Sequence, residues 1–148
     1  MEFWLGHSIS KDRFFAVARK IFGGDLSKIR VRPDASTPLS DEDKGKDLGM
    51  SQHIREDYLG TSVTATEDDS IDPHELARAL ATEGGVDVLW YDDTGASGEE
   101  EWDWAGFTTA PYILFKPDGS EHRARMDEHS AADEVNPRGF AGKLILLD

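Results

Sequence analysis

Carboxylates and tryptophans gather in one stretch of this sequence, and they are the side chains best placed to do chemistry. Residues 86–107 read VDVLWYDDTGASGEEEWDWAGF and contain three of the four tryptophans and seven acidic residues, without a lysine or arginine. Two kinds of site fit this composition. Carboxylates can hold a hydrated Mg²⁺ ion, and exposed aromatic side chains surrounded by acids are typical of a surface that binds a basic protein.

The strand period separates the two kinds of side chain at the end of this stretch. Successive side chains of a β-strand point to opposite faces, so Trp102 and Trp104 share one face while Glu101 and Asp103 share the other. This pattern favours the binding surface. The candidate partner-binding residues are Tyr91, Asp92, Asp93, Glu99, Glu100, Glu101, Trp102, Asp103 and Trp104.

The preceding strand divides in the same way. Val86, Val88 and Trp90 share one face, and Asp87, Leu89 and Tyr91 share the opposite one. We expect Trp90 to lie in the core, facing the helices. Trp102 lies between Glu101 and Asp103, and Trp104 follows Asp103, so both tryptophans are equally compatible with core positions and with partly exposed anchors.

Motifs that resemble catalytic or metal sites each lack a required residue. His74-Glu75 begins a helix as zinc proteases do, but Arg78 stands where the second histidine ligand belongs. Residues 68–72 resemble the start of a calcium loop, but Pro73 replaces the glycine that such a loop needs. The sequence GASG, residues 95–98, lies between two predicted strands, so it predicts a hairpin turn and not a nucleophile elbow.

No catalytic residue, metal ligand set or cofactor motif is therefore predicted, and we do not expect an enzyme. The five histidines share no ligand spacing. A carboxylate-dependent enzyme remains an alternative, since Asp92 and Asp93 are close in sequence to Glu99, Glu100 and Glu101.

Two helices with clear boundaries help to position these residues. Ser10 is a good N-cap for a helix over Lys11–Phe22, which ends at a pair of glycines. Asp72, Pro73 and Glu75 form an N-terminal capping pattern for a helix that runs to about Glu83.

Short β-rich runs surround the two helices, and the order of elements predicts a single α+β domain over residues 1–148. Two β–α–β units followed by a meander imply two helices packed on one face of a largely antiparallel sheet. The predicted strands are residues 1–9, 29–32, 62–66, 86–92, 100–107, 112–115, 121–126 and 143–147.

Residues 33–60 interrupt this alternation. They are rich in turn-forming residues and have weak periodicity. We expect a long excursion with at most a short helix around Ser51 to Tyr58. Loops of this length are either functional or poorly ordered.

The charge distribution limits the partners. The net charge is −14, and the first 32 residues carry seven basic and three acidic side chains. The remaining residues carry nine basic and 27 acidic ones. Such a surface repels nucleic acid and anionic membranes and attracts a basic protein. Adaptation to high salt is the alternative explanation, because Asp outnumbers Glu by 18 to 12.

The absence of cysteine fits a reducing compartment. The N-terminus has no basic leader or long apolar run, so we expect a cytoplasmic protein.

In size, acidity and lack of a catalytic motif, the whole chain resembles bacterial toxin immunity proteins. The resemblance implies a small protein-binding inhibitor that neutralises a cognate cationic toxin by masking its active or binding surface. A third possibility is an acidic nucleic-acid mimic. That function needs a long negative stripe, which the basic residues of the first helix interrupt.

Overall fold

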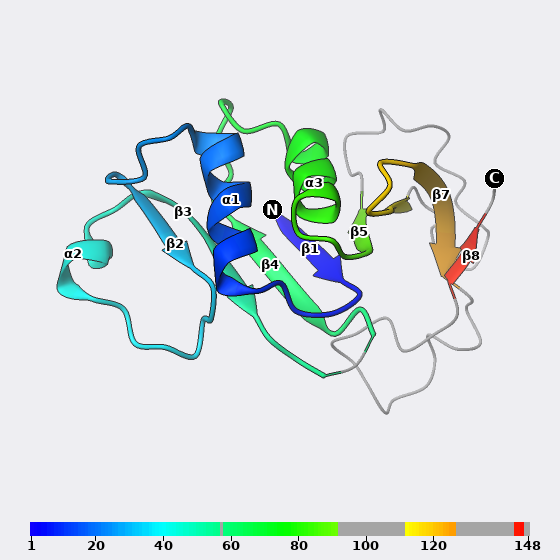
Figure 1. Cartoon of the computed structure of the whole chain (residues 1–148), viewed down its shortest axis with the longest axis horizontal. Coiled ribbons are helices and arrows are strands. Elements are labelled where there is room, and N and C mark those ends of the chain that lie inside the picture. Colours follow the sequence, from blue (N-terminus) through cyan, green and yellow to red (C-terminus); the bar gives the residue numbers. More distant parts are fainter. Residues whose placement is uncertain (57, 92–111, 127–143, 147–148) are drawn as a thin grey trace, which may run out of the picture.

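The computed structural model describes residues 1–56, 58–91, 112–126 and 144–146, in which three helices and an eight-stranded sheet are formed (Figure 1). The helices are α1 (Lys11–Phe22), α2 (Asp41–Lys44) and α3 (Pro73–Thr82). The strands are β1 (Glu2–Leu5), β2 (Ile29–Arg32), β3 (Leu48–His53), β4 (Thr61–Ala65), β5 (Val88–Tyr91), β6 (Tyr112–Phe115), β7 (Glu121–Met126) and β8 (Leu144–Leu146).

The sheet is largely antiparallel, as predicted. Its strand order is β2-β3-β4-β1-β5-β6-β7-β8, and β2 and β3 are the only parallel neighbours in the described part of the chain. The two predicted β–α–β units are β1–α1–β2 and β4–α3–β5. Neither unit joins adjacent strands, because β1 lies between β4 and β5, and β4 and β3 lie between β1 and β2.

Helix α1 has the bounds and the buried face that the sequence predicts. The Ser10 side chain accepts a hydrogen bond from the Arg13 backbone N–H at 3.4 Å, and Gly23 ends the helix with φ 95°. The buried side chains are Phe14, Val17 and Ala18, which recur at helical spacing.

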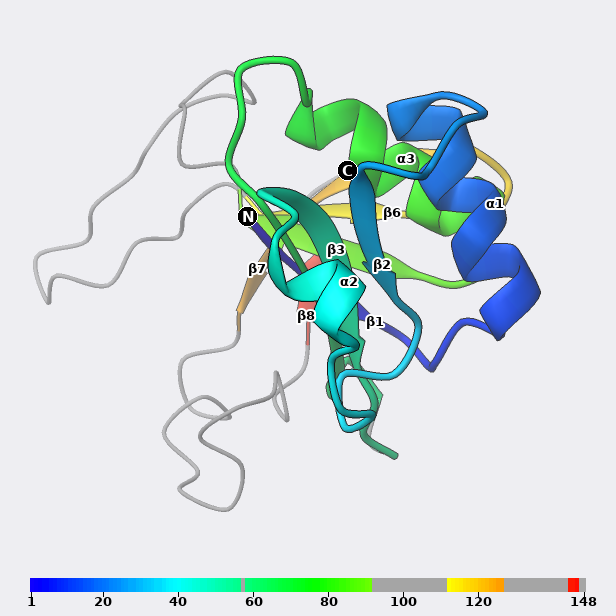
Figure 2. The same cartoon turned by 90° about the vertical axis from the view of Figure 1, so that its left-hand side faces the viewer.

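Helix α3 begins at the predicted capping sequence. Asp72 Oδ1 accepts a hydrogen bond from the His74 N–H at 2.9 Å, and Pro73 occupies the first helical position. Figure 2 shows α1 and α3 side by side on the same face of the sheet. Two polar contacts also join α1 to the end of α3: Arg13 donates to the Gly84 carbonyl, and Lys20 pairs with Glu83.

The main hydrophobic core lies between these helices and the sheet. Trp90 belongs to it with 6% of its surface exposed, which confirms the predicted position. Full burial of an apolar side chain of this kind contributes roughly 1.5–3 kcal/mol. The largest fully buried apolar residues of this core are Phe3, Leu5, Phe14, Met50, Leu76, Leu80 and Phe115.

The excursion at residues 33–60 differs from its prediction. The short helix expected around Ser51 to Tyr58 is wrong, because β3 occupies Leu48–His53 and pairs with both β2 and β4. The helix in this segment is α2, which lies at the β2 edge of the sheet, away from α1 and α3 (Figures 1 and 2). The polar residue Gln52 is fully buried within β3, so this strand does not have a recognisable apolar pattern.

The meander is confirmed where the structure describes it. The predicted strands 29–32, 112–115 and 121–126 have those bounds, and the strand predicted at 86–92 is Val88–Tyr91. The predicted strand at 100–107 and the preceding turn lie outside the described residues.

Candidate functional site

Tyr91 is the one candidate partner-binding residue that the structure describes. It is half-buried at the end of β5 and lies on the sheet face opposite α1 and α3, together with Leu89, as the strand period predicts. The other candidates lie outside the described residues: Asp92, Asp93, Glu99, Glu100, Glu101, Trp102, Asp103 and Trp104.

Tyr91 belongs to a group of aromatic side chains on this face. It is paired with Tyr112 of β6, and the two ring centroids are 5.3 Å apart with an interplanar angle of 64°. Leu89 is paired with Trp4 of β1 on the other side of β5. Leu59, Leu89 and Leu114 are buried beneath Trp4 and Tyr112. We call the set Trp4, Tyr58, Tyr91 and Tyr112 the aromatic face.

Tyr58 is the most exposed member of the aromatic face, at 55%. Its hydroxyl donates to Asp87 Oδ2 at 2.8 Å, and Lys116 Nζ donates to the same oxygen at 3.2 Å. The tyrosine ring packs against Gly6, where a Cβ atom would lie 3.1 Å from Tyr58 Cε2. A side chain at this position would therefore displace the ring.

Two tyrosine hydroxyls of this face remain protonated at neutral pH. Partial burial, together with the hydrogen bond to Asp87 and its negative charge, raises the pKa of Tyr58 to about 12. Burial and the neighbouring Tyr91 raise the pKa of Tyr112. Protonated phenols donate hydrogen bonds and are weak nucleophiles, so the aromatic face is suited to recognition.

An open depression of about 460 Å³ adjoins the aromatic face beside Trp4. Polar residues of β1, β3 and β4 line it, and a ring nitrogen of His53 lies 3.3 Å from Thr64 Oγ1. The depression extends the face toward β3 with groups that donate and accept hydrogen bonds. Its main lining residues are Glu2, Trp4, His53, Arg55, Ser62 and Thr64.

His74, which the sequence associates with a capping pattern, contacts a carboxylate from a distant strand. A ring nitrogen of His74 lies 2.5 Å from Glu121 Oε1, and Arg78 donates to Glu121 Oε2 from Nε at 3.2 Å and Nη2 at 2.8 Å. Partial burial raises the pKa of Glu121, but the hydrogen bonds and positive charges of Arg78 and His74 outweigh it, so the net pKa is lowered.

Because both oxygens of Glu121 are bonded, we interpret the cluster as a structural link between α3 and β7. Within the described ranges, no group of three or more His, Asp or Glu side chains is arranged to hold a metal ion.

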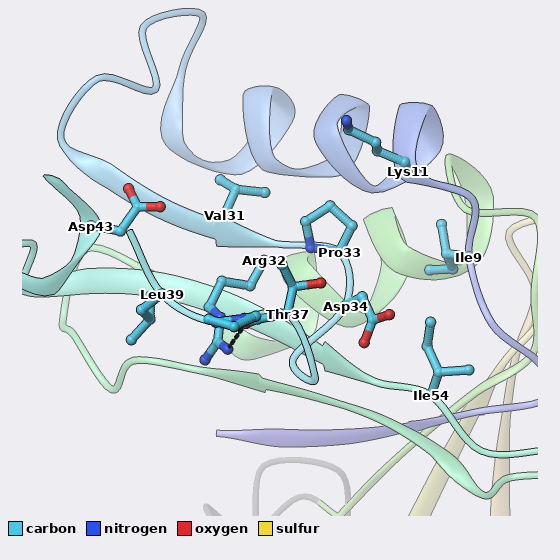
Figure 3. A pocket seen from close by; sticks show the side chains of 11 residues that line it. Ile9, Lys11, Val31, Arg32, Pro33, Asp34, Thr37, Leu39, Asp43 and Ile54 are labelled. Atoms are coloured by element: carbon cyan, nitrogen blue, oxygen red, sulfur yellow. Dashed lines mark hydrogen bonds between the residues drawn. The ribbon is translucent and has the colours of Figure 1, made fainter. Parts of the chain in front are cut away.

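A separate pocket of about 370 Å³ lies at the carboxyl ends of β2 and β3 (Figure 3). We call it the β2 pocket. Its charged lining residues are Lys11, Arg32, Asp34 and Asp43. Its apolar lining residues are Ile9, Val31, Pro33, Pro38, Leu39 and Ile54.

The side chain of Gln52 holds two walls of the β2 pocket together. Its Oε1 accepts from the Ile9 N–H at 2.7 Å, and its Nε2 donates to the carbonyls of Ile9 at 3.0 Å and Pro33 at 2.8 Å. Arg32 Nη2 donates to the carbonyls of Ala35 and Thr37, both at 2.7 Å. These hydrogen bonds fix the connection after β2, which contains the lining residue Thr37.

Sequence reasoning missed Trp4, Tyr58 and Tyr112 of the aromatic face, and Gln52 beside the β2 pocket. Trp4 and Tyr112 join the aromatic face only through strand pairing, and their signal is their alternation with core residues on the same strands. Gln52 has no sequence signal, because a single glutamine in a polar segment is normally exposed.

Comparison with known proteins found no matching family, no matching curated protein and no matching solved structure. In the parts of the chain that the structure covers, no helix has the length and apolar character needed to cross a membrane.

Proposed function

We propose that this chain is a small acidic inhibitor that binds and masks a basic protein. The observation that carries the proposal is the aromatic face, in which the half-buried rings of Tyr91 and Tyr112 are in edge-to-face contact and Trp4 packs on the same leucine layer as Tyr112. Tyrosine and tryptophan are enriched among the residues that dominate binding energy at protein interfaces. Their packing on a buried leucine layer limits the side-chain entropy lost on binding.

The charge of the chain favours a basic partner. The net charge is −14, and residues 92–107, which follow Tyr91, contain six acidic side chains and no lysine or arginine. Acidic groups at the rim of an interface accelerate the encounter with a cationic surface. An immunity protein that neutralises a cationic toxin in the cytoplasm is the most economical version of this function.

The first test concerns the anchors. The chain is mixed with the basic protein encoded beside its gene, and the complex is followed by stopped flow. We expect Tyr91→Ala to accelerate dissociation and to weaken binding by about 2 kcal/mol, because an aromatic anchor is lost.

Phe15→Ala is the matched control, because Phe15 is a half-buried aromatic residue of α1 on the other face of the sheet. Equal dissociation rates for the two variants would rule out the aromatic face as the contact. Failure of every basic neighbour to bind the wild-type chain would argue against an immunity protein.

The second test concerns the rim. Reversing Glu99, Glu100 and Glu101 to Lys should mainly slow association and reduce its salt dependence, because rim charges act through long-range attraction. The control reverses Glu67, Asp69 and Glu75, three exposed acids near the start of α3, and changes the net charge equally. If both triple variants associate equally slowly, only total charge matters and the acidic run is not a rim.

A further inference from the structure

The β2 pocket is distinct from the aromatic face and lies where three strands end. Strands β1, β2 and β3 run in the same direction. The residues that follow these strands therefore lie at the same end of the sheet. Ile9 and Lys11 follow β1, Pro33 and Asp34 follow β2, and Ile54 follows β3. Ligand sites of open sheets commonly lie at the carboxyl ends of parallel strands.

The apolar part of the pocket is accessible to solvent. Ile54 is 49% exposed and is one of two large hydrophobic residues that are exposed in the described part of the chain. Figure 3 shows Ile9 and Ile54 at one end of the pocket and Leu39 toward the other. A volume of about 370 Å³ falls within the range of small-molecule sites, roughly 300–1,000 Å³. The open apolar wall and this volume would suit a small aliphatic group.

Among the described residues, the charged side chains that line the pocket, together with Lys46, comprise three cations and two anions. Lys46 Nζ lies 2.8 Å from Asp43 Oδ1, so these two charges compensate each other. Asp34 lies close to Arg32, whose charge lowers the carboxyl pKa after the larger effect of the Ser36 hydrogen bonds. Lys11 is exposed and forms no ion pair with any described residue. An anionic group beside Lys11 would neutralise its positive charge.

We propose that the β2 pocket binds a small aliphatic carboxylate, with the hydrocarbon against Ile9, Leu39 and Ile54 and the carboxylate beside Lys11. The hydrogen bonds of Gln52 and Arg32 hold the pocket walls in place before binding, which reduces the ordering cost. The proposal does not depend on the protein-binding function of the aromatic face.

The test compares three ligands that share a hydrocarbon chain and differ in charge: hexanoate, hexanol and hexylammonium. Each is titrated into the full chain and followed by NMR of backbone amides and methyl groups. Hexanoate should shift the signals of Ile9, Leu39 and Ile54, with an affinity about threefold above that of hexanol, as expected for one exposed ion pair. Hexylammonium should bind more weakly than hexanol.

Two lysine variants separate the ion pair from general charge. Lys11→Met keeps the aliphatic stem, so hexanoate and hexanol should then bind equally. Lys28→Met removes the same charge from an exposed lysine outside the pocket, and the preference for hexanoate should remain. Ile54→Ser should weaken both ligands by about tenfold, because apolar contact area is lost.

Three results would overturn the proposal. The first is hexanoate binding that is absent or shifts signals away from the pocket. The second is an affinity for hexylammonium that equals the affinity for hexanoate. The third is an equal effect of Lys11→Met and Lys28→Met.

Discussion

Gln52 illustrates how one buried amide can position two connections of the chain. It is fully buried, and its amide bonds to both the N–H and the carbonyl of Ile9 and to the carbonyl of Pro33. The connections that leave β1 and β2 are thereby fixed to β3. A buried polar group is stable only when its hydrogen bonds are satisfied, so this arrangement requires both connections to keep their backbone positions.

Gln52→Leu should destabilise the protein by about 3 kcal/mol, because one N–H and two carbonyls lose their partner in a buried environment. Urea unfolding measures the change. His53→Leu is the control, since His53 is exposed on the same strand and should change stability by less than about 0.5 kcal/mol. A small effect of Gln52→Leu would mean that water or the backbone replaces the amide.

Tyr58 gives a prediction at high pH. Its pKa is raised to about 12 from the ordinary value of 10.0, so the folded state favours the protonated phenol. The associated stability is complete below pH 10.0 and is lost as the pH rises through about 12. Tyr58→Phe should remove the last phenolate transition from an absorbance titration and reduce the alkaline loss of stability. Loss of a transition near the ordinary value of 10.0, rather than near 12, would contradict the contact with Asp87.

The two longer helices were predictable because local chemistry determines their ends. Ser10 and Asp72 accept hydrogen bonds from backbone N–H groups of α1 and α3, respectively, and apolar residues recur at the helical period between cap and glycine. These signals need no information from the rest of the chain. The hairpin of β6 and β7 was predictable for the same reason, because the turn at Gly119 joins two strands that are adjacent in sequence.

Strand β3 was not predictable because its stabilising contacts are distant in sequence. It contains no β-branched residue, and its glycine is needed for close packing. A Cβ atom at Gly49 would lie 2.6 Å from the carbonyl oxygen of Arg30 on the neighbouring β2. Parallel pairing with β2 and burial of Gln52 therefore override weak local propensity.

The candidate site was predictable in part. The alternation along β5 places Tyr91 and Leu89 on one face and Trp90 on the other, as the structure confirms. The surroundings of Tyr91 depend on the order of strands, because Tyr112 of β6 pairs with Tyr91 and Trp4 of β1 pairs with Leu89 on the same face. Sequence periodicity predicts which side chains of one strand share a face of the sheet. The order of the strands determines which side chains of different strands become neighbours on that face.

The link between α3 and β7 leads to a prediction at low pH. The pKa of Glu121 is lowered in the folded state, so its contribution to stability is present above the unfolded value of 4.5 and is lost as the pH falls through the folded pKa. Denaturant unfolding of the wild type should therefore lose more stability below pH 4.5 than that of Glu121→Gln. Parallel stability curves would show that Arg78 and His74 do not stabilise the carboxylate.

At the scale of the whole molecule, charge is distributed unevenly along the fold. The first 32 residues form β1, α1 and β2 and carry seven basic and three acidic side chains. The acidic excess belongs to the rest of the chain, so the molecule combines a basic helix with a strongly negative remainder. Every described ion pair keeps part of its surface in contact with solvent, and solvent-exposed pairs contribute little to stability. Repulsion among the unpaired acids should therefore dominate the response to salt.

Stability should rise with added salt and then level off. The distance over which charges interact falls from about 30 Å at about 10 mM salt to about 3 Å at about 1 M, so the repulsion caused by a net charge of −14 is screened. We expect the melting temperature to rise by about 5 °C over this range, equivalent to about 1–2 kcal/mol. Reversing Glu67, Asp69 and Glu75 to Lys adds two positive charges at each position, which changes the net charge from −14 to −8 and should reduce the rise in melting temperature.

A fall in melting temperature with added salt would instead show that attraction within ion pairs dominates. A continued rise well above about 1 M, where screening is complete, would favour adaptation to high salt over partner binding as the reason for the acidity.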